Sequence, residues 1–338
     1  MLINYWYVAC RSKNLTNKPL GKKILNEEIV LFRDSNNNAV ILKDVCPHRN
    51  VQLSKGKNNK GHIQCAYHGW EFDGKGKCIF IPSLMSQDKI SSELKIKKYN
   101  VIEQQGFIWV WIGDREPENT EKPVFIEELD LDNWSNTFFY GETNTSIDNV
   151  IENFMDSPHT GYLHGGLFRS NKEKHTAKAI IKTTDDGVTN DITEEDSNID
   201  SLLGNLLIGK NSKVFHQDKF ILPSIVKVQY EMGNYKIRGY HIFTPIDEYK
   251  TEINVRVVWN FGFIGNFIKP LVNFFGVKIL KQDVEILDNQ GEIIKKYGED
   301  FSSSSADTIN IYVKNILNKV KENKEFKTNI EKEIEFRL

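Results

Sequence analysis

Short apolar runs separated by turn residues fill the first third of the chain. Residues 29–33 and 39–42 are two such runs, and a cluster of Asp, Ser and Asn lies between them, which predicts a β-hairpin. Residues 106–112 form a further apolar and aromatic run. Short strands with turn signals between them favour a sandwich or an open barrel. We therefore expect a small all-β domain over residues 1–116.

The remaining residues, 117–338, follow a charged, proline-bounded segment and show a different pattern. Strand-like stretches recur between Gly, Asn and Asp turns, and longer helical patterns accompany them. This mixture predicts an α+β domain in which helices pack on an antiparallel sheet. The charge-dense tail after Lys319 indicates a solvated helix. The strand-like stretches are 137–142, 177–183, 220–231, 236–244 and 251–261, and the helical patterns are 147–163, 264–295 and 307–324.

Composition narrows the class of protein. The chain has 338 residues, 39% hydrophobic and 27% charged, with a net charge of −2. This balance is typical of an ordinary two-domain protein and carries no basic footprint for nucleic acid. No apolar run reaches the roughly 18 residues of a membrane span, and we see no signal peptide at the start. Four cysteines make no disulfide scaffold, so we expect a cytoplasmic protein.

Two loops of the first domain each carry one cysteine and one histidine. Cys46 and His48 form a Cys-x-His pair, and Cys65 and His68 form a Cys-x-x-His pair. A [2Fe–2S] cluster needs four ligands, and two neutral imidazoles on one iron raise its potential. Structural zinc is the alternative, but zinc sites usually pair Cys with Cys and His with His at wider spacing. The four residues therefore predict a cluster held between two hairpin tips.

A second motif reads Glu152-x3-Asp156-x2-His159-x4-His164. Two histidines and a carboxylate with open coordination positions hold non-haem Fe(II) in oxygenases. The step between the histidines is longer than a helical turn, but Pro158 permits a kink that lets both imidazoles converge. Asp156 is placed to accept from the second N–H of His159. The alternative is that both histidines are ordinary helix-surface or core residues.

The third iron ligand must come from elsewhere, and Asp283 is the candidate. Apolar residues flank it on one helical stripe, within about 60° at 100° per residue. A buried unpaired carboxylate is costly, so Asp283 needs a cation, either a metal or a salt-bridge partner from Lys or Arg. Glu285 and Asp288 fall away from the stripe, and we expect them in solvent. The apolar residues of the stripe are Ile279, Leu280, Ile286 and Leu287.

In this order the two motifs resemble the oxygenase component of Rieske non-haem iron oxygenases, and the resemblance covers nearly the whole chain. It implies a Rieske domain followed by a helix-grip, START-like catalytic domain with an antiparallel sheet and long C-terminal helices. The chain length resembles the homotrimeric monooxygenase and demethylase branch, in which Asp156 bridges towards a cluster histidine. The residues that the resemblance assigns are Cys46, His48, Cys65 and His68 for the [2Fe–2S] cluster, and His159, His164 and Asp283 for a mononuclear Fe(II).

The implied function is that of a terminal oxygenase, a monooxygenase or a dioxygenase. It takes electrons from NAD(P)H through a separate flavin- or ferredoxin-type reductase and uses O2 to hydroxylate, demethylate or desaturate a small organic substrate, aromatic or cyclic. The alternatives are a Rieske electron carrier fused to a non-catalytic ligand-binding domain, and a ligand-binding protein with a vestigial cluster. Residues of this kind are more often plain core than pocket lining. The candidates for lining a substrate pocket are Phe154, Met155, Tyr162, Leu167, Phe168, Phe215, Tyr240 and Phe275.

Overall fold

The computed structural model describes residues 1–165, 176–194 and 214–337. It divides the chain into two compact units, one of residues 3–125 and one of residues 1–2 with 126–338. Among the described residues, no helix is both long and apolar enough to cross a membrane.

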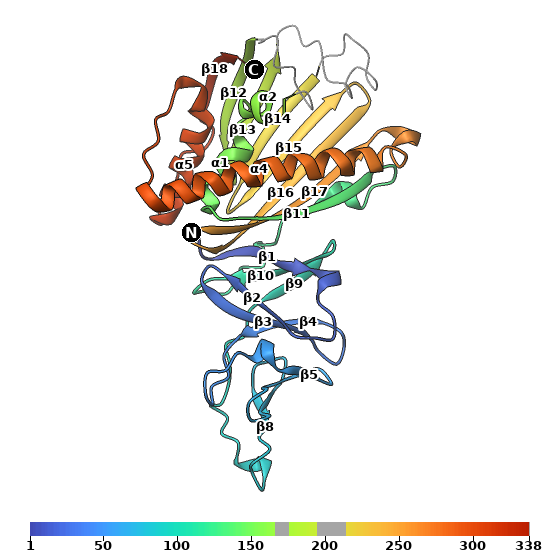
Figure 1. Cartoon of the computed structure of the whole chain (residues 1–338), viewed down its shortest axis with the longest axis vertical. Coiled ribbons are helices and arrows are strands. Elements are labelled where there is room, and N and C mark those ends of the chain that lie inside the picture. The colour runs from blue at the N-terminus through green and yellow to red at the C-terminus, as the bar shows by residue number, and fades with distance from the viewer. Residues whose placement is uncertain (166–175, 195–213, 338) are drawn as a thin grey trace. The chain divides into compact units, whose positions relative to one another are not determined.

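The unit of residues 3–125 consists of three antiparallel sheets (Figure 1). The expected hairpin is confirmed, because β3 (Glu27–Arg33) pairs with β4 (Ala39–Lys43). The expected aromatic strand is β10 (Phe107–Ile112), and all of its side chains are buried. The other strands are β1 (Tyr5–Arg11), β2 (Leu20–Ile24), β5 (Lys57–Asn59), β6 (His62–Gln64), β7 (Glu71–Phe72), β8 (Cys78–Phe80) and β9 (Val101–Gln104), and short 3-10 turns are η1 (Ser12–Asn14), η2 (Leu53–Lys55) and η3 (Gln87–Lys89).

Two apolar clusters hold this unit together. One cluster lies between the β1-β10-β9 sheet and the β2-β3-β4 sheet. It includes Tyr7, Leu31 and Ile108. The other includes both cysteines of the predicted cluster, Cys46 and Cys65. The two cysteine loops therefore start from a packed core.

The second unit is built on one eight-stranded antiparallel sheet in the order β11-β17-β16-β15-β14-β13-β12-β18. The long helix α4 (Lys269–Tyr297) crosses this sheet in Figure 1, and α1 packs on strands β14 to β17. This is the expected α+β helix-grip arrangement. Its other elements are η4 (Glu127–Leu129), β11 (Ser135–Thr143), α1 (Ile147–Met155), α2 (His159–Leu163), β12 (Thr176–Thr184), β13 (Gly187–Glu194), β14 (Val214–Ile221), β15 (Ile225–Met232), β16 (Tyr235–Asp247), β17 (Lys250–Asn260), η5 (Gly262–Ile264), η6 (Ser305–Asp307), α5 (Thr308–Lys321) and β18 (Glu331–Arg337).

The helical pattern predicted over residues 147–163 is broken in the structure. Helix α1 ends at Met155 and α2 begins at His159, so the break falls at Pro158 as predicted. Ser146 starts α1, since its side chain accepts from the amide of Asn149 at 3.4 Å. The break separates α1 from the segment that carries two candidate metal ligands, His159 and His164.

Two predicted elements are wrong. The stretch 220–231 is not one strand, because β14 and β15 are separate strands joined by a turn that contains Pro223. Proline has no amide to donate to a ladder. The tail after Lys319 is not one solvated helix, because it ends in strand β18. Ile334 and Phe336 alternate with charged residues and pack on the buried core of β12 and β13, which a helical reading misses.

Candidate metal centres

The two cysteine loops repeat one backbone arrangement. In each loop the cysteine amide donates to the carbonyl five residues later, at 2.9 Å for Cys46 and 2.8 Å for Cys65. The cysteine carbonyl accepts from the amide four residues later, at 2.9 and 3.1 Å. That fourth residue, Asn50 or Gly69, has a positive φ of 56° or 71°. Both residue types tolerate this conformation, so the sequence permits the same tight loop twice.

The side chains of these loops separate into an inner and an outer pair. Cys46 and Cys65 are only 2% and 4% exposed. His48 is half-buried, His68 is exposed, and their ring centroids lie 4.4 Å apart. Trp70 stacks on His48 at 4.5 Å, with the rings 7° from parallel. Two buried sulfurs beneath two converging imidazoles match a ligand set of two thiolates on one iron and two imidazoles on the other.

The chemistry of these donors also fits a cluster. Burial raises the pKa of the Cys46 thiol to about 11, although the backbone amides of His48 and Arg49 point at its sulfur and oppose the rise. A bound cation is what keeps such a thiol deprotonated near neutral pH. In the described part of the chain, the buried Nδ1 of His48 has no hydrogen-bond partner. An imidazole nitrogen left open in this way is available as a ligand.

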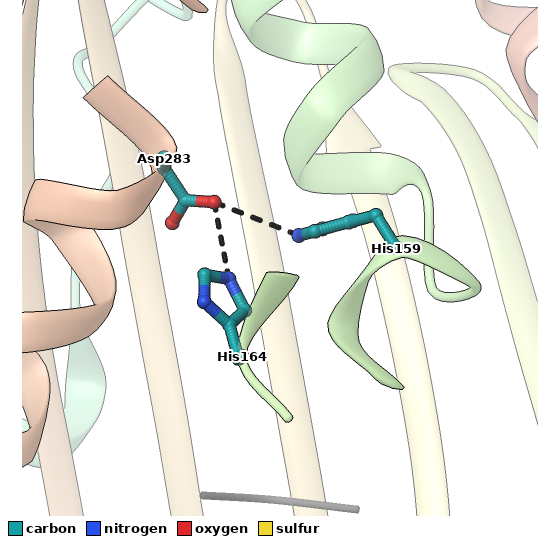
Figure 2. A group of neighbouring side chains, drawn as sticks. All are labelled: His159, His164 and Asp283. Carbon is teal, nitrogen blue, oxygen red and sulfur yellow. Dashed lines mark ion pairs between the residues drawn. The ribbon is translucent and has the colours of Figure 1, made fainter. Parts of the chain in front are cut away.

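His159, His164 and Asp283 form a second group, with one donor atom from each within 4.8 Å of the others (Figure 2). Asp283 Oδ1 lies 3.1 Å from His164 Nε2 and 3.6 Å from His159 Nε2. Asp283 and His164 are each 2% exposed. Asp283 Oδ1 has no hydrogen-bond partner among the described residues. The salt bridge to Lys or Arg that the sequence left open is replaced by two histidines, a donor set that suits a divalent metal.

Neighbouring acceptors orient both imidazoles. His164 Nδ1 donates to Gln282 Oε1 at 3.0 Å, and His159 Nδ1 donates to the backbone carbonyl of Asp156. Each Nδ1 therefore carries a hydrogen, which leaves Nε2, the nitrogen that faces Asp283, as the atom that can bind a metal once any proton on it is displaced. The carboxylate of Asp156 lies 3.6 Å from His159 Nδ1, so the backbone carbonyl rather than the carboxylate takes the hydrogen bond.

The electrostatics of the group call for positive charge. Burial alone lowers the pKa of His159, but the carboxylates of Asp156 and Asp283 outweigh it and raise that pKa to about 9. Burial likewise raises the pKa of Asp283, and the two histidines reverse this and hold it below its usual value. A proton on His159 thus supplies the positive charge that a bound metal cation would supply to the same carboxylates.

The neighbours of Asp283 on α4 only partly follow the prediction. Leu280 and Leu287 are buried beside it, but Ile286 is 46% exposed, so the buried stripe is narrower than expected. Glu285 is exposed, as predicted. The prediction that Asp288 lies in solvent is wrong. Its carboxylate accepts from Thr143 Oγ1 at 2.9 Å and from the amide of Asn144 at 2.6 Å. These donors lie at the end of β11. The helical periodicity of α4 cannot predict that this strand end lies beside Asp288.

Sequence reasoning missed a buried polar chain beside the triad. Ser157 Oγ donates to Asp218 Oδ2 at 2.9 Å, and His216 Nε2 lies 3.0 Å from Asp218 Oδ1. All three residues are under 9% exposed. The alternation of strand β14 puts His216 and Asp218 on one face, a signal that was present in the sequence. Through Ser157, this chain holds the break between α1 and α2.

The aromatic pocket candidates do not share one location. Tyr240 donates to Glu128 Oε2 at 2.9 Å and packs with Ile126 and Val258, on the face of β16 opposite His241. Phe154 contacts His241, with ring centroids 4.7 Å apart. Met155 is buried, Phe275 is half-buried, and Phe215 and Tyr162 are exposed. Leu167 and Phe168 lie outside the described residues.

A pair of Cys–His loops followed by a two-histidine, one-aspartate group on a helix-grip sheet defines a class, the Rieske non-haem iron oxygenase components. Two family models match the chain: the Rieske [2Fe-2S] domain over residues 5–100, and the vanillate O-demethylase oxygenase C-terminal domain over residues 143–323. The chain belongs to the family of Rieske oxygenase components that carry this vanillate O-demethylase type of C-terminal domain.

Individual relatives agree with this family. The vanillate O-demethylase oxygenase subunit of a Pseudomonas species is 36% identical over 188 residues, which cover 55% of this chain and 51% of that one. Protein TIC 55, chloroplastic, of Pisum sativum is 29% identical over 303 residues, which cover 86% of this chain and 52% of that one. The chain thus spans about half the length of these curated relatives. The crystal structure of dicamba monooxygenase bound to 3,6 dichlorosalicylic acid shares the fold, with a TM-score of 0.83 at 24% identity over 96% of this chain and 98% of that one.

Proposed function

We propose that the chain is a terminal oxygenase. It uses O2, and electrons that a separate NAD(P)H-dependent reductase of the flavin or ferredoxin type delivers, to hydroxylate, demethylate or desaturate a small organic substrate, aromatic or cyclic. The observation that carries the proposal is the meeting of His159, His164 and Asp283 in a chain that also has a Rieske domain. An electron carrier with a non-catalytic second domain has no use for a buried triad of two histidines and an aspartate.

In this proposal the Rieske part, residues 1–116, holds the cluster, and residues 117–338 form the catalytic part. Cys46 and Cys65 bind one iron, and His48 and His68 bind the other. Buried sulfurs and a half-buried and an exposed imidazole support this division. Exposure of His68 brings the cluster edge to the surface, where an electron partner can reach it.

In the catalytic part, His159, His164 and Asp283 hold the iron. When bound, the two metal groups supply single-electron transfer and O2 activation. The residues prepare that chemistry. Gln282 holds the proton of His164 on Nδ1, so that Nε2 faces the metal position, and the backbone carbonyl of Asp156 does the same for His159.

We further propose a cytoplasmic homotrimer, as the family resemblance implies. One chain's cluster then lies beside the next chain's iron, and Asp156 bridges His159 of its own chain and His68 of the neighbour. Head-to-tail contacts of this kind close into rings. Four free cysteines in the structure are compatible with a reducing compartment.

Metal analysis with substrate screening tests the oxygenase proposal. Anaerobically reconstituted protein should hold about three irons and two sulfides per chain, of which two irons belong to the cluster. With a reductase and a panel that starts from aryl methyl ethers, O2 uptake should match product formation. The similarity to a vanillate O-demethylase oxygenase subunit supports that choice of panel. Only two irons, and no O2 uptake with any substrate, would favour the electron carrier.

A mixing experiment tests the ring. His68→Ala lacks the cluster and His159→Ala lacks the iron, so each variant alone is inactive. Under conditions that reassort subunits, mixed rings should regain part of the activity, because some interfaces pair an intact cluster with an intact iron. A monomer, or mixed rings without activity, would contradict transfer between chains.

A further inference from the structure

A row of large apolar side chains projects into solvent along the start of α4 and the turn before it. Phe263 is 91% exposed, Phe267 81%, Phe274 66%, Val277 58% and Leu271 37%. A single exposed apolar residue needs no explanation, but a contiguous group of this size marks an interaction site. We call these five residues the α4 outer face.

The residues of the α4 outer face do not belong to the core, because the buried residues of α4 lie on another side of the helix. In α4 the buried residues are Leu280, Asp283, Leu287 and Gly291, which face the sheet and the metal group. At 100° per residue, Phe274 lies about 180° from Asp283, and Leu271 and Val277 lie about 60° to either side of Phe274. The helix therefore has two apolar sides, one that packs inside the unit and one that is exposed.

The charged side chains on the α4 segment that carries the outer face are lysines, and the nearest exposed acidic residue further along α4, Glu285, pairs with Lys281 at 3.7 Å. No Asp or Glu occurs between Ile253 and Gln282, whereas Lys269, Lys278 and Lys281 are exposed on the same part of the helix. Phenylalanines on one side with lysines along the border are the chemistry of a helix that lies in the interface of an anionic bilayer.

A second copy of the chain in a two-fold contact fits this face less well; the head-to-tail ring proposed above is a different kind of contact, and the sedimentation measurement below tests it. A two-fold contact places the same patch on both sides, so the three lysines of one copy would approach the three lysines of the other. Anionic lipid headgroups instead complement the lysines while the acyl region takes up the phenylalanines.

We propose that the α4 outer face binds the surface of anionic lipid membranes, with the phenylalanine side chains inserted below the headgroups. The inference does not depend on the reaction that the metal group performs. It predicts a peripheral attachment in which α4 lies parallel to the membrane plane.

Flotation of the metal-loaded full chain with vesicles tests the proposal. The protein should float with phosphatidylglycerol–phosphatidylcholine vesicles and much less with phosphatidylcholine alone. The variant Phe263→Ser/Phe267→Ser/Phe274→Ser should lose about tenfold or more in partition per phenylalanine. A matched control removes three exposed apolar residues elsewhere, Phe125→Ser/Leu131→Ser/Ile311→Ser, and should float like the wild type.

Charge gives a second arm. Lys269→Gln/Lys278→Gln/Lys281→Gln should weaken binding to the anionic vesicles by about fivefold per lysine and leave the weak binding to phosphatidylcholine unchanged. Equal losses on both vesicle types would contradict the electrostatic part of the proposal.

Depth is measured independently of any loss of fold. Phe267→Trp adds a fluorophore to the face, and brominated lipids should quench its emission beyond the quenching of the wild-type tryptophans. No extra quenching, or serine variants that bind like the wild type, would overturn the proposal. So would wild-type protein that ignores vesicles while the triple serine variant sediments as a smaller oligomer, because the face would then join copies of the chain.

Discussion

The two candidate metal centres of this protein are built in opposite ways. The cluster loops lie between residues 46 and 70 of one unit, and each is a short turn with its own cysteine, histidine and positive-φ residue. The triad takes two side chains from residues 159–164, after the helix break, and the third from the middle of α4. The first centre is a property of local sequence, whereas the second exists only when the sheet and α4 bring distant segments together.

The largest expected effect is on the non-local centre. Asp283→Ala should remove the mononuclear iron and all turnover while the visible spectrum of the Rieske cluster stays intact, because Asp283 supplies the only carboxylate of the triad. Metal analysis and product assays measure this. Glu285→Ala, two residues away and exposed, is the control and should keep both. Loss of iron from Asp288→Ala, with iron retained in Asp283→Ala, would show that the wrong carboxylate was chosen.

Asp156 joins the two centres in the proposed ring, so Asp156→Asn should slow electron transfer between them without loss of either metal. The variant should keep both metals, since the backbone carbonyl of Asp156 still accepts from His159. Reoxidation of the reduced cluster should slow by orders of magnitude. Stopped-flow absorbance in the presence of substrate and O2 measures this rate. Glu152→Gln, one turn earlier, should reoxidise at the wild-type rate. Unchanged rates in Asp156→Asn would remove this residue from the path.

The local centre should respond in potential rather than in occupancy. His48→Cys or His68→Cys should lower the reduction potential by on the order of 100 mV, because a thiolate replaces a neutral imidazole on one iron. Electrochemistry of each variant measures the shift. His62→Cys adds a thiol outside the two loops and should not move it. A variant that keeps its cluster at the wild-type potential would reject the ligand assignment.

The contrast between the centres also explains what the sequence could predict. The strand pattern of residues 29–42, the break at Pro158 and the burial of Asp283 follow from local periodicity and proline chemistry, and all three are found. The hydrogen bond from His164 to Gln282 joins residues 118 positions apart, and the chain from Ser157 to Asp218 spans 61. No local pattern reports such pairs. Strand β18 was missed because its charges hid a period of two.

Gln282 is the member of the non-local centre that orients without ligating. Gln282→Leu should lower the iron affinity by about 10- to 100-fold, because Nδ1 of His164 loses the acceptor that fixes its tautomer and ring direction. Competition against a chelator gives the affinity. Gln290→Leu, two turns later on α4, is the matched control. An unchanged affinity would mean that packing alone holds His164 in place.

The last prediction concerns the proton that His159 carries in the metal-free protein. The carboxylates of Asp156 and Asp283 overcome the effect of burial and raise the pKa of His159 to about 9, so in the metal-free protein this imidazole is protonated at neutral pH. Iron must displace that proton. The apparent affinity for Fe(II) should therefore rise about tenfold per pH unit from neutral pH towards pH 9 and then level off with respect to this group. Anaerobic titrations across that range measure the slope. Asp156→Asn removes one of the two carboxylates that raise this pKa, so its plateau should begin at a lower pH. A slope of zero in the wild type would show that His159 is neutral before the metal arrives.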